Sequence, residues 1–101
     1  MIIENAEFTI TEGREEEFEA VMRKARAVVA ASPGFISIDL ARGVERPSVY
    51  LVRIAWRTVE NHTKDFRESD LYARWSELVR PFWSEPAKVE HWDLRMNPFR
   101  G

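Results

Sequence analysis

The sequence contains no cysteine among its 101 residues. It therefore has no disulfide framework, no thiolate nucleophile and no thiolate metal site, which suits a reducing compartment, and we expect a cytoplasmic protein. Its longest uncharged apolar stretch, Ala27 to Ala31, is far shorter than the roughly 20 residues that span a bilayer. The N-terminal residues Met1 to Glu4 lack the basic segment of a signal peptide. These absences predict a soluble, untargeted chain with no membrane partner.

The sequence also lacks an excess of positive charge and a glycine-rich loop. It carries 15 basic and 17 acidic residues, a net charge of −2, so no basic stripe is available for phosphates and we expect no nucleic-acid partner. Gly13, Gly34 and Gly43 are isolated from one another, and nothing resembles a dinucleotide fingerprint. We therefore predict no flavin or nicotinamide site and no cofactor.

The length and the apolar fraction of 45% are those of one folded domain. We assign residues 1–96 to a single domain and residues 97–101 to a loose C-terminal tail. A domain of this size buries only about two-thirds of the surface that its unfolded chain exposes, so dimerisation would be a natural source of extra stability.

Hydrophobic periodicity predicts four strands and three helices. Gly13 opens the first helix, whose first turn carries Glu15 to Glu17 near the positive end of the helix dipole, and Ser32 to Gly34 stop it. Thr58 and Ser69 are the expected N-caps of a two-piece helix. The predicted strands cover Ile3–Ile10, Phe35–Arg42, Val49–Arg57 and Ala87–Met96, and the two later helices run to Glu68 and to Val79.

This order predicts an α+β, ferredoxin-like fold: a four-stranded antiparallel sheet with the helices on one face. The strand from Val49 is apolar on both sides, so Val49 and Leu51 would join Phe35 on the face without helices. The last strand, whose inward face the pattern leaves open, would add Trp92 and Leu94. Since a soluble monomer rarely tolerates such a patch, we expect a homodimer packed sheet against sheet.

The residues then suggest a family. The motifs are Thr11-Glu12-Gly13 before an acidic turn and Phe18, Ser32-Pro33-Gly34-Phe35, Tyr50-Leu51-Val52, Trp56-Arg57-Thr58, His62, Phe66-Arg67-Glu68-Ser69 and Pro86-Ala87-Lys88-Val89-Glu90-His91-Trp92. Together, from the first strand to the last, they resemble the antibiotic biosynthesis monooxygenase domain. The resemblance implies a dimeric α+β barrel with a ligand pocket between helices and sheet in each subunit.

The resemblance leaves the reaction open, because members of this family differ in chemistry. In the quinone-forming members an asparagine, a tryptophan and a tyrosine would fall on His62, Phe66 and Tyr72, and only the tyrosine is kept. In the haem-degrading members an asparagine, a tryptophan and a histidine would fall on Ala6, Phe66 and Trp75, and none is kept. Haem degradation is therefore disfavoured.

His62 and His91 are the only side chains whose ordinary pKa suits proton transfer near neutral pH, so they are the leading catalytic candidates. His62 lies one turn before Phe66, and His91 shares the alternation of Val89, so both would point between helices and sheet. The alternative is a solvated His62 and a structural His91. An iron site with Asp65 or Asp93 lacks diagnostic spacing, and we expect no metal.

Aromatic residues make up 12% of the sequence and gather around the later helices. Tyr72 stands one position off the apolar stripe, so its hydroxyl is a third catalytic candidate. The predicted substrate-binding residues are Phe66, Trp75, Phe82 and Trp83, although aromatic residues at helical spacing, such as Trp75, are more often core. Arg53, alone on an apolar strand face, predicts an ion pair at the dimer interface rather than an anion contact.

These observations predict a cofactor-independent monooxygenase that oxidises a small electron-rich aromatic, a hydroquinone or an anthrone, with O₂. The substitutions at His62 and Phe66 favour a different class, a non-oxygenase small-molecule-binding or detoxifying stress protein on the same dimeric scaffold. A lyase or isomerase is a third class, and it would turn over without oxygen uptake.

Overall fold

The computed structural model describes residues 1–101 as one antiparallel sheet covered on one face by helices. The strands lie in the order β2-β3-β1-β4, and every neighbouring pair is antiparallel. The predicted ferredoxin-like fold class is confirmed. In chain order the elements are β1 (Ile2–Thr9), α1 (Glu15–Ala30), β2 (Phe35–Arg42), β3 (Val49–Trp56), the π-helix η1 (Asn61–Phe66), α2 (Asp70–Val79), the 3₁₀ turn η2 (Arg80–Phe82) and β4 (Lys88–Asp93).

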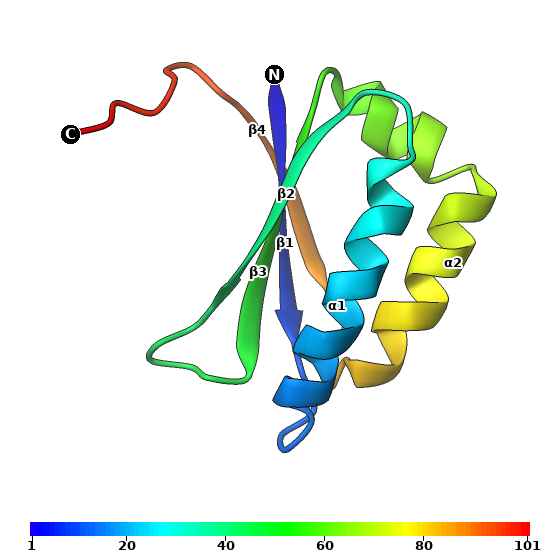
Figure 1. Ribbon diagram of the computed structural model, residues 1–101, viewed down its shortest axis with the longest axis vertical. Coiled ribbons are helices and arrows are strands. Elements are labelled where there is room, and N and C mark those ends of the chain that lie inside the picture. The colour runs from blue at the N-terminus through cyan, green and yellow to red at the C-terminus, as the bar shows by residue number, and fades with distance from the viewer.

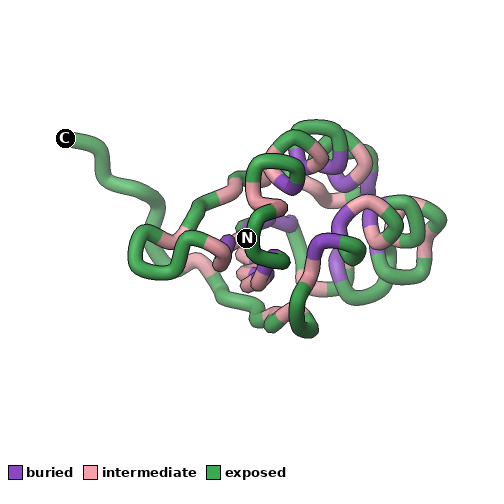
Figure 2. Tube along the Cα trace, turned by 90° about the horizontal axis from the view of Figure 1, so that it is seen from below, coloured by how far each residue is buried: buried purple, intermediate pink, exposed green.

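The core lies between the sheet and the helices. Figure 1 shows α1 and α2 side by side over the same face of the sheet, and Figure 2 shows the buried segments gathered between these layers. Alternate residues of the two central strands point into this layer because side chains alternate across a strand. They are Glu4, Ala6 and Phe8 of β1 and Tyr50, Val52, Ile54 and Trp56 of β3, all 6% exposed or less. No helix of this fold is long and apolar enough to cross a membrane.

The helix after β3 differs from the expected α-helix. Thr58 does act as a cap, since its Oγ1 accepts the backbone N–H of Asn61 at 3.2 Å. The chain then widens into a π-turn, in which the N–H of Arg67 donates to the carbonyl of His62. Ser69 occupies the N-cap position of α2, but its hydroxyl donates to the carbonyl of Phe66 instead of capping the helix.

The last strand is shorter than expected and ends at Asp93. Its partner β1 begins at Ile2, opposite Asp93, and one further hydrogen bond joins the N–H of Leu94 to the carbonyl of Met1. Residues 97–101 belong to no helix or strand, and Figure 1 shows the C-terminus projecting away from the sheet.

The face of the sheet without helices is apolar, but Phe35 is not part of it. A register shift between Phe35 and Ser37 turns the Phe35 ring inward, where it meets Trp56 edge to face at 6.2 Å. The expectation that Phe35 lies on the open face is therefore wrong. Ile36 takes its place and is 44% exposed, and Trp92 is 57% exposed.

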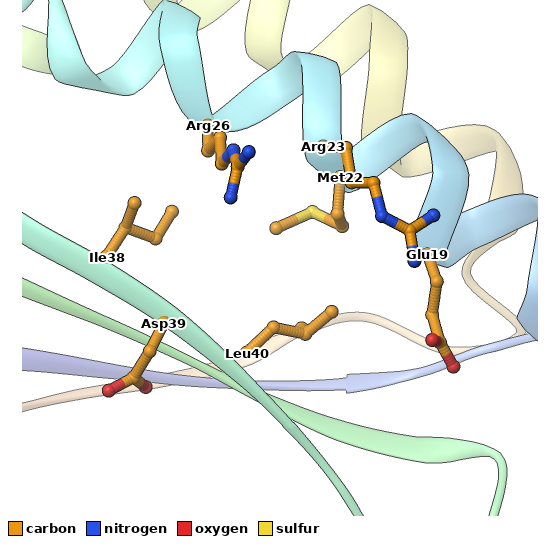
Figure 3. Close-up of a pocket in the computed structure, with 7 residues that line it drawn as sticks. All are labelled: Glu19, Met22, Arg23, Arg26, Ile38, Asp39 and Leu40. Carbon is orange, nitrogen blue, oxygen red and sulfur yellow. The ribbon is translucent and has the colours of Figure 1, made fainter.

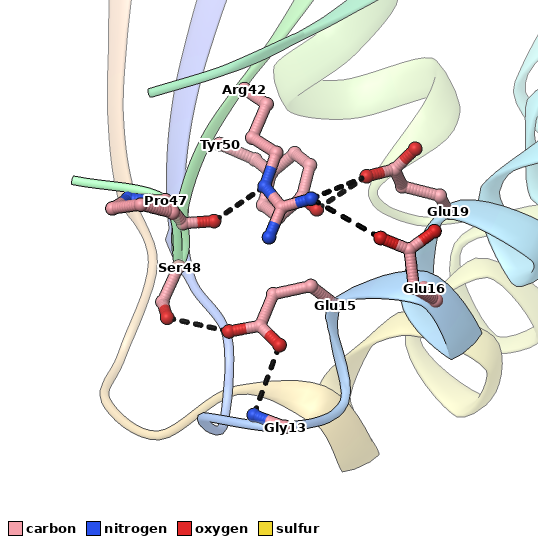
Figure 4. Close-up of polar contacts among 8 residues, drawn as sticks. All are labelled: Gly13, Glu15, Glu16, Glu19, Arg42, Pro47, Ser48 and Tyr50. Atoms are coloured by element: carbon pink, nitrogen blue, oxygen red, sulfur yellow. Dashed lines mark hydrogen bonds and ion pairs between the residues drawn. The ribbon is translucent and has the colours of Figure 1, made fainter. Parts of the chain in front are cut away.

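One end of the inner layer, which we call the closed end, is filled by the rings of Phe18, Tyr50 and Phe82, with centroids of Phe18 5.0 and 5.9 Å from the other two. Around it, polar contacts fasten α1 to the turn between β2 and β3 (Figure 4). Tyr50 donates its hydroxyl to Glu19 at 2.6 Å, and Ser48 donates to Glu15 at the same distance. These contacts fix the start of α1 on the sheet.

Candidate active site

The opposite end of the inner layer holds a cavity of about 270 Å³, which we call the hollow end. β1, β3 and β4 form its floor, and residues between the start of η1 and the start of β4 form its walls. Nine of its fourteen lining residues are hydrophobic. The residues are Glu4, Ala6, Phe8, Ile54, His62, Phe66, Arg67, Tyr72, Trp75, Arg80, Trp83, Pro86, Ala87 and Val89.

Three ionisable side chains form a chain at this cavity. The Nε2 atom of His62 lies 3.3 Å from Oε1 of Glu4, and its Nδ1 lies 2.7 Å from Nε2 of His91. Glu4 and His62 are 6% and 3% exposed, whereas His91 is exposed. Trp56 donates its indole N–H to the same Glu4 oxygen at 3.0 Å and stacks on the His62 ring, with 5.8 Å between centroids. We call Glu4, His62 and His91 the proton chain.

Local structure explains why these residues meet. Glu4 and His91 stand opposite each other in the β1–β4 register and share the inner face of the sheet. His62 reaches them from η1, whose first residue, Asn61, packs directly on Gly34. A Cβ at Gly34 would overlap the Asn61 amide, and the φ of Gly34 is +79°, so this position requires glycine. The close approach holds η1 against the end of the sheet.

Burial determines the protonation of the proton chain. It raises the pKa of Glu4 to about 7, against the hydrogen bond from Trp56 and the charge of Arg67, which both lower it. Burial, together with the charges of His91 and Arg67, lowers the pKa of His62 to about 4. Burial and Arg67 also lower the pKa of His91. At neutral pH both imidazoles are therefore neutral, and Glu4 exchanges a proton readily.

Tyr72 lies between two arginines at the wall of the cavity. Arg80 donates to the Tyr72 hydroxyl at 3.0 Å, and the guanidinium of Arg67 lies 5.6 Å above the ring centroid. Burial opposes ionisation of Tyr72, but the hydrogen bond and charge of Arg80 and the charge of Arg67 outweigh it and lower the pKa of the phenol. Nearby, the buried indole N–H of Trp83 has no partner. This wall therefore offers several donors to an anionic or oxygen-bearing ligand.

The structure brings most of the predicted site residues together. His62, Phe66, Tyr72, Trp75 and Trp83 all line the cavity, and His91 reaches it through His62. Phe82 does not line it. Its ring packs at the closed end against Phe18, with the guanidinium of Arg14 4.4 Å from its centroid. The alternative of a solvated His62 is wrong, because this side chain is buried.

Sequence reasoning missed Glu4, Arg67 and Arg80. A signal for Glu4 was present, since it continues the alternation of Ala6 and Phe8 and so places a carboxyl on the buried face of a strand. Buried carboxyl groups without a cation partner are uncommon and cluster at functional sites. The two arginines have no comparable signal, because their position depends on how η1 and η2 pack.

The carboxylates considered for a metal site have other partners. Asp65 accepts a hydrogen bond from the side-chain amide of Asn61 at 3.0 Å. Asp93 lies 3.8 Å from Arg95. The structure therefore does not direct either carboxylate to the histidine pair.

A second, smaller hollow of about 140 Å³ lies between α1 and β2 (Figure 3). Met22, Ile38 and Leu40 form its apolar surface, and Arg23, Arg26, Glu19 and Asp39 line it as well. Its ionisable side chains are carboxylates and guanidinium groups, and no histidine lines it. We therefore place the candidate active site at the hollow end.

Comparison with known proteins identifies the family. The model of the antibiotic biosynthesis monooxygenase family matches residues 1–78. The chain belongs to this family. A crystal structure of a proposed antibiotic biosynthesis monooxygenase from Bordetella bronchiseptica is 35% identical, covers 94% of this chain and 97% of its own, and superimposes with a TM-score of 0.91. The family predicted from the sequence motifs is thus confirmed.

Two further relatives show how far the similarity extends. The Bacillus subtilis protein YczJ, which is uncharacterised, is 36% identical over 91 residues, or 90% of this chain and 96% of YczJ. A variant of SnoaB, a cofactor-independent oxygenase from Streptomyces nogalater, shares the fold at 19% identity with a TM-score of 0.79, covering 95% of this chain and 94% of its own. The likeness to SnoaB concerns the fold alone.

Proposed function

We propose that this protein is a cofactor-independent monooxygenase that oxidises a small, electron-rich aromatic of the hydroquinone or anthrone type to a quinone. The observation that carries the proposal is the proton chain at the end of an aromatic-walled cavity. It supplies a proton acceptor that is active near neutral pH beside a surface that suits a flat ring. Membership of the family and the likeness of the fold to a cofactor-independent oxygenase support it.

The proposed chemistry makes the substrate its own source of electrons. The protein removes a proton from the substrate, and the resulting anion transfers one electron to O₂. The two radicals combine to a peroxide, which takes up a proton and loses water to leave a carbonyl group. For an anthrone, the substrate and O₂ are thereby converted to the quinone and water. Positioned proton transfer contributes about 10²- to 10⁴-fold to such a rate.

The remaining cavity residues orient the substrate and stabilise its charge. Phe66, Trp75 and Trp83 form apolar walls that exclude water from the reacting ring. Arg67 lies close enough to the proton chain to lower its pKa values, so it also favours an anion beside Glu4. Tyr72, which lines the cavity and is held by Arg80, donates or accepts a hydrogen bond.

The proposed functional unit is a homodimer. Ile36 and Trp92 are large apolar side chains left exposed on the open face of the sheet, and half-buried Leu51 lies on the same face. Arg53 stands there too and pairs with Asp39 at 2.9 Å. A second copy packed on this face would cover the patch. Equilibrium sedimentation should give twice the monomer mass, and Leu51→Glu should give the monomer; a wild-type monomer at micromolar concentration would contradict the dimer.

Oxygen uptake tests the activity. Chelator-treated protein is given a panel of hydroquinones and anthrones in an oxygen-electrode cell, and the products are identified by mass spectrometry. We expect O₂ consumption matched by quinone formation, and a loss of about 10²-fold or more for His62→Ala. If no member of the panel is consumed, the oxygenase proposal fails.

The rival is a binding or detoxifying protein on the same scaffold, and it is favoured by His62 and Phe66 standing where quinone-forming relatives carry asparagine and tryptophan. Native mass spectrometry separates the two. A co-purifying quinone-like ligand supports the oxygenase, and an unrelated acid or lipid supports the binder.

A further inference from the structure

We propose that Glu4 takes the substrate proton, and that His62 and His91 carry this proton from the cavity to solvent at the open edge of the sheet. The inference rests on the proposed function and goes further by assigning separate roles to the carboxyl group and the two imidazoles. It makes Glu4 the catalytic base and the histidines its connection to water.

The free atoms of the proton chain decide which group meets the substrate. Both ring nitrogens of His62 are occupied, Nε2 by Glu4 at 3.3 Å and Nδ1 by His91 at 2.7 Å. Neither ring nitrogen of His62 is therefore free to meet a ligand in the cavity. Glu4 uses only Oε1 for Trp56 and His62, and its Oε2 makes no hydrogen bond or ion pair within the protein. Because Glu4 lines the cavity, this second oxygen is the acceptor available to a substrate.

The far end of the proton chain reaches water. His91 is exposed, lies on β4 at the edge of the sheet and is not one of the residues that line the cavity. Glu4 and His62 are almost fully buried. A proton that enters at Glu4 would thus be trapped without the two imidazoles. The 2.7 Å contact between them is short enough for transfer along a hydrogen bond.

Trp56 holds Glu4 and His62 in position. Its indole N–H donates to Glu4, and its ring lies at 19° to the His62 ring. Since Trp56 is fully buried, it cannot turn away without repacking the core. Trp56 is therefore a positioning residue for the proton chain.

The outward transfer balances protons and leaves both imidazoles neutral. At the start Glu4 is ionised, and neutral His62 carries its proton on Nδ1, facing His91. The acidic C–H of the anthrone, or the O–H of its enol tautomer, breaks; its proton passes to Oε2 of Glu4, and its electron pair stays on the substrate anion. The carboxyl group then turns to bring this proton to His62 Nε2, and the Nδ1 proton of His62 moves to His91 Nε2. His91 releases the proton of its own Nδ1 to water.

The same path then runs in reverse. O₂ takes one electron from the substrate anion, and the two radicals combine to a peroxide anion. His91 takes a proton from water at Nδ1, each group passes one proton inward, and Glu4 delivers one to the peroxide. Loss of water from the hydroperoxide leaves the carbonyl group. The substrate is oxidised, O₂ is reduced, and all three side chains return to their initial tautomers.

The test compares Glu4→Gln with Glu19→Gln in oxygen-uptake kinetics on an anthrone. Glu19 is the matched control, because it also accepts a hydrogen bond from an aromatic side chain but lies outside the cavity. We expect Glu4→Gln to lower kcat by about 10²- to 10⁴-fold with KM changed only a few-fold, and to remove the acid limb of the pH profile near pH 7. Glu19→Gln should keep the wild-type kcat.

His91→Ala supplies the readout for the exit path. Its kcat should fall and should recover as imidazole buffer is added, while Glu4→Gln should not respond to imidazole. A wild-type kcat in Glu4→Gln, together with a large loss in His62→Ala, would overturn the inference and make His62 the base.

A measurement without substrate separates this inference from the proposed function. In protein labelled with ¹³C at glutamate side chains, the Glu4 carboxyl should titrate near pH 7 and the midpoint should move in His62→Gln. If wild-type protein consumes no O₂, the oxygenase proposal fails and the titration still decides the proton chain. A Glu4 carboxyl that titrates near 4.5 would overturn the inference whatever the turnover.

Discussion

Two glutamates of the inner layer accept a hydrogen bond from an aromatic side chain, yet their surroundings differ. Glu19 at the closed end accepts from Tyr50 at 2.6 Å, has a side chain 28% exposed, and lies 3.5 Å from Arg42 (Figure 4). Glu4 at the hollow end accepts from Trp56 at 3.0 Å, has a side chain 8% exposed, and its only ion-pair partner is His62. Solvent and a permanent cation make Glu19 structural, whereas their absence makes Glu4 able to exchange a proton.

The two ends also differ in packing. At the closed end Phe18, Tyr50 and Phe82 fill the space between α1 and the sheet, each 5% exposed or less. At the hollow end Phe66 and Trp75 are also buried, at 2% and 7% exposed, but they stand around a cavity. Dense packing stabilises the fold at one end, and open space at the other leaves room for a ligand.

Truncation of an aromatic ring to alanine at each end should give the largest difference in unfolding free energy between the two ends. We expect Phe18→Ala to cost about 3–5 kcal/mol of unfolding free energy, because its ring is fully enclosed by packed neighbours. Phe66→Ala should cost less, since one side of its ring already faces the cavity and loses fewer contacts. Urea unfolding followed by tryptophan fluorescence measures both. Equal losses would mean that the hollow end is packed in solution.

Removal of each carboxyl charge should affect the unfolding free energy differently. The pKa of Glu4 is raised to about 7 from 4.5, so folding favours its neutral form and stability is lost as pH rises from about 4.5 to 7. Glu4→Gln should therefore gain up to about 3 kcal/mol over wild type at pH 8 and little at pH 4. Glu19→Gln, which loses a contact with Arg42, should gain nothing at either pH. A Glu4→Gln protein that is less stable at pH 8 would contradict the burial argument.

The pKa values of the two tyrosines should be shifted in opposite directions from the ordinary value. Burial and the hydrogen bond to Glu19 raise the pKa of Tyr50, while Arg80 helps to lower the pKa of Tyr72 despite burial. Arg80→Gln should raise the midpoint of the Tyr72 phenolate, observed in the Tyr50→Phe background by absorbance at alkaline pH. An unchanged midpoint would mean that Arg80 does not lower the pKa of Tyr72.

The smallest effect belongs to a third carboxylate, on the open face of the sheet. Asp39 and Arg53 form a two-bonded pair at 2.9 and 3.1 Å, but both side chains are more than half exposed. In a dilute monomer Arg53→Ala should change the unfolding free energy by less than about 1 kcal/mol. If a second copy buries the pair, the unfolding free energy that Arg53→Ala removes should grow with protein concentration. Denaturation at two protein concentrations therefore separates an exposed pair from one buried in a dimer.

Much of the fold follows from the sequence pattern. The alternation of β1 and the apolar stripe of α1 depend on near neighbours, and both elements lie within a residue or two of their predicted bounds. Phe35 was misplaced because a register shift depends on how β2 meets β3, which the strand's own pattern does not contain. The π-turn at η1 was missed for a similar reason, since its wide turn packs on Gly34.

The candidate site was predictable in its residue types but not in its connections. The ordinary pKa of histidine pointed to His62 and His91, and the aromatic cluster pointed to Phe66 and Tyr72. The partnership of Glu4 with His62 joins residues of β1 and η1 that are far apart in sequence. The raised pKa of Glu4 also needs the burial that the covering helices provide, so only the packed structure reveals it.

The most direct test of the proton chain is histidine NMR from pH 4 to 8 in protein labelled with ¹⁵N at the imidazoles. We expect His62 to stay neutral until the pH approaches 4 and its Nδ1 to share a hydrogen bond with His91 Nε2. A His62 that titrates near 6.5 with no coupling to His91 would contradict the proton chain.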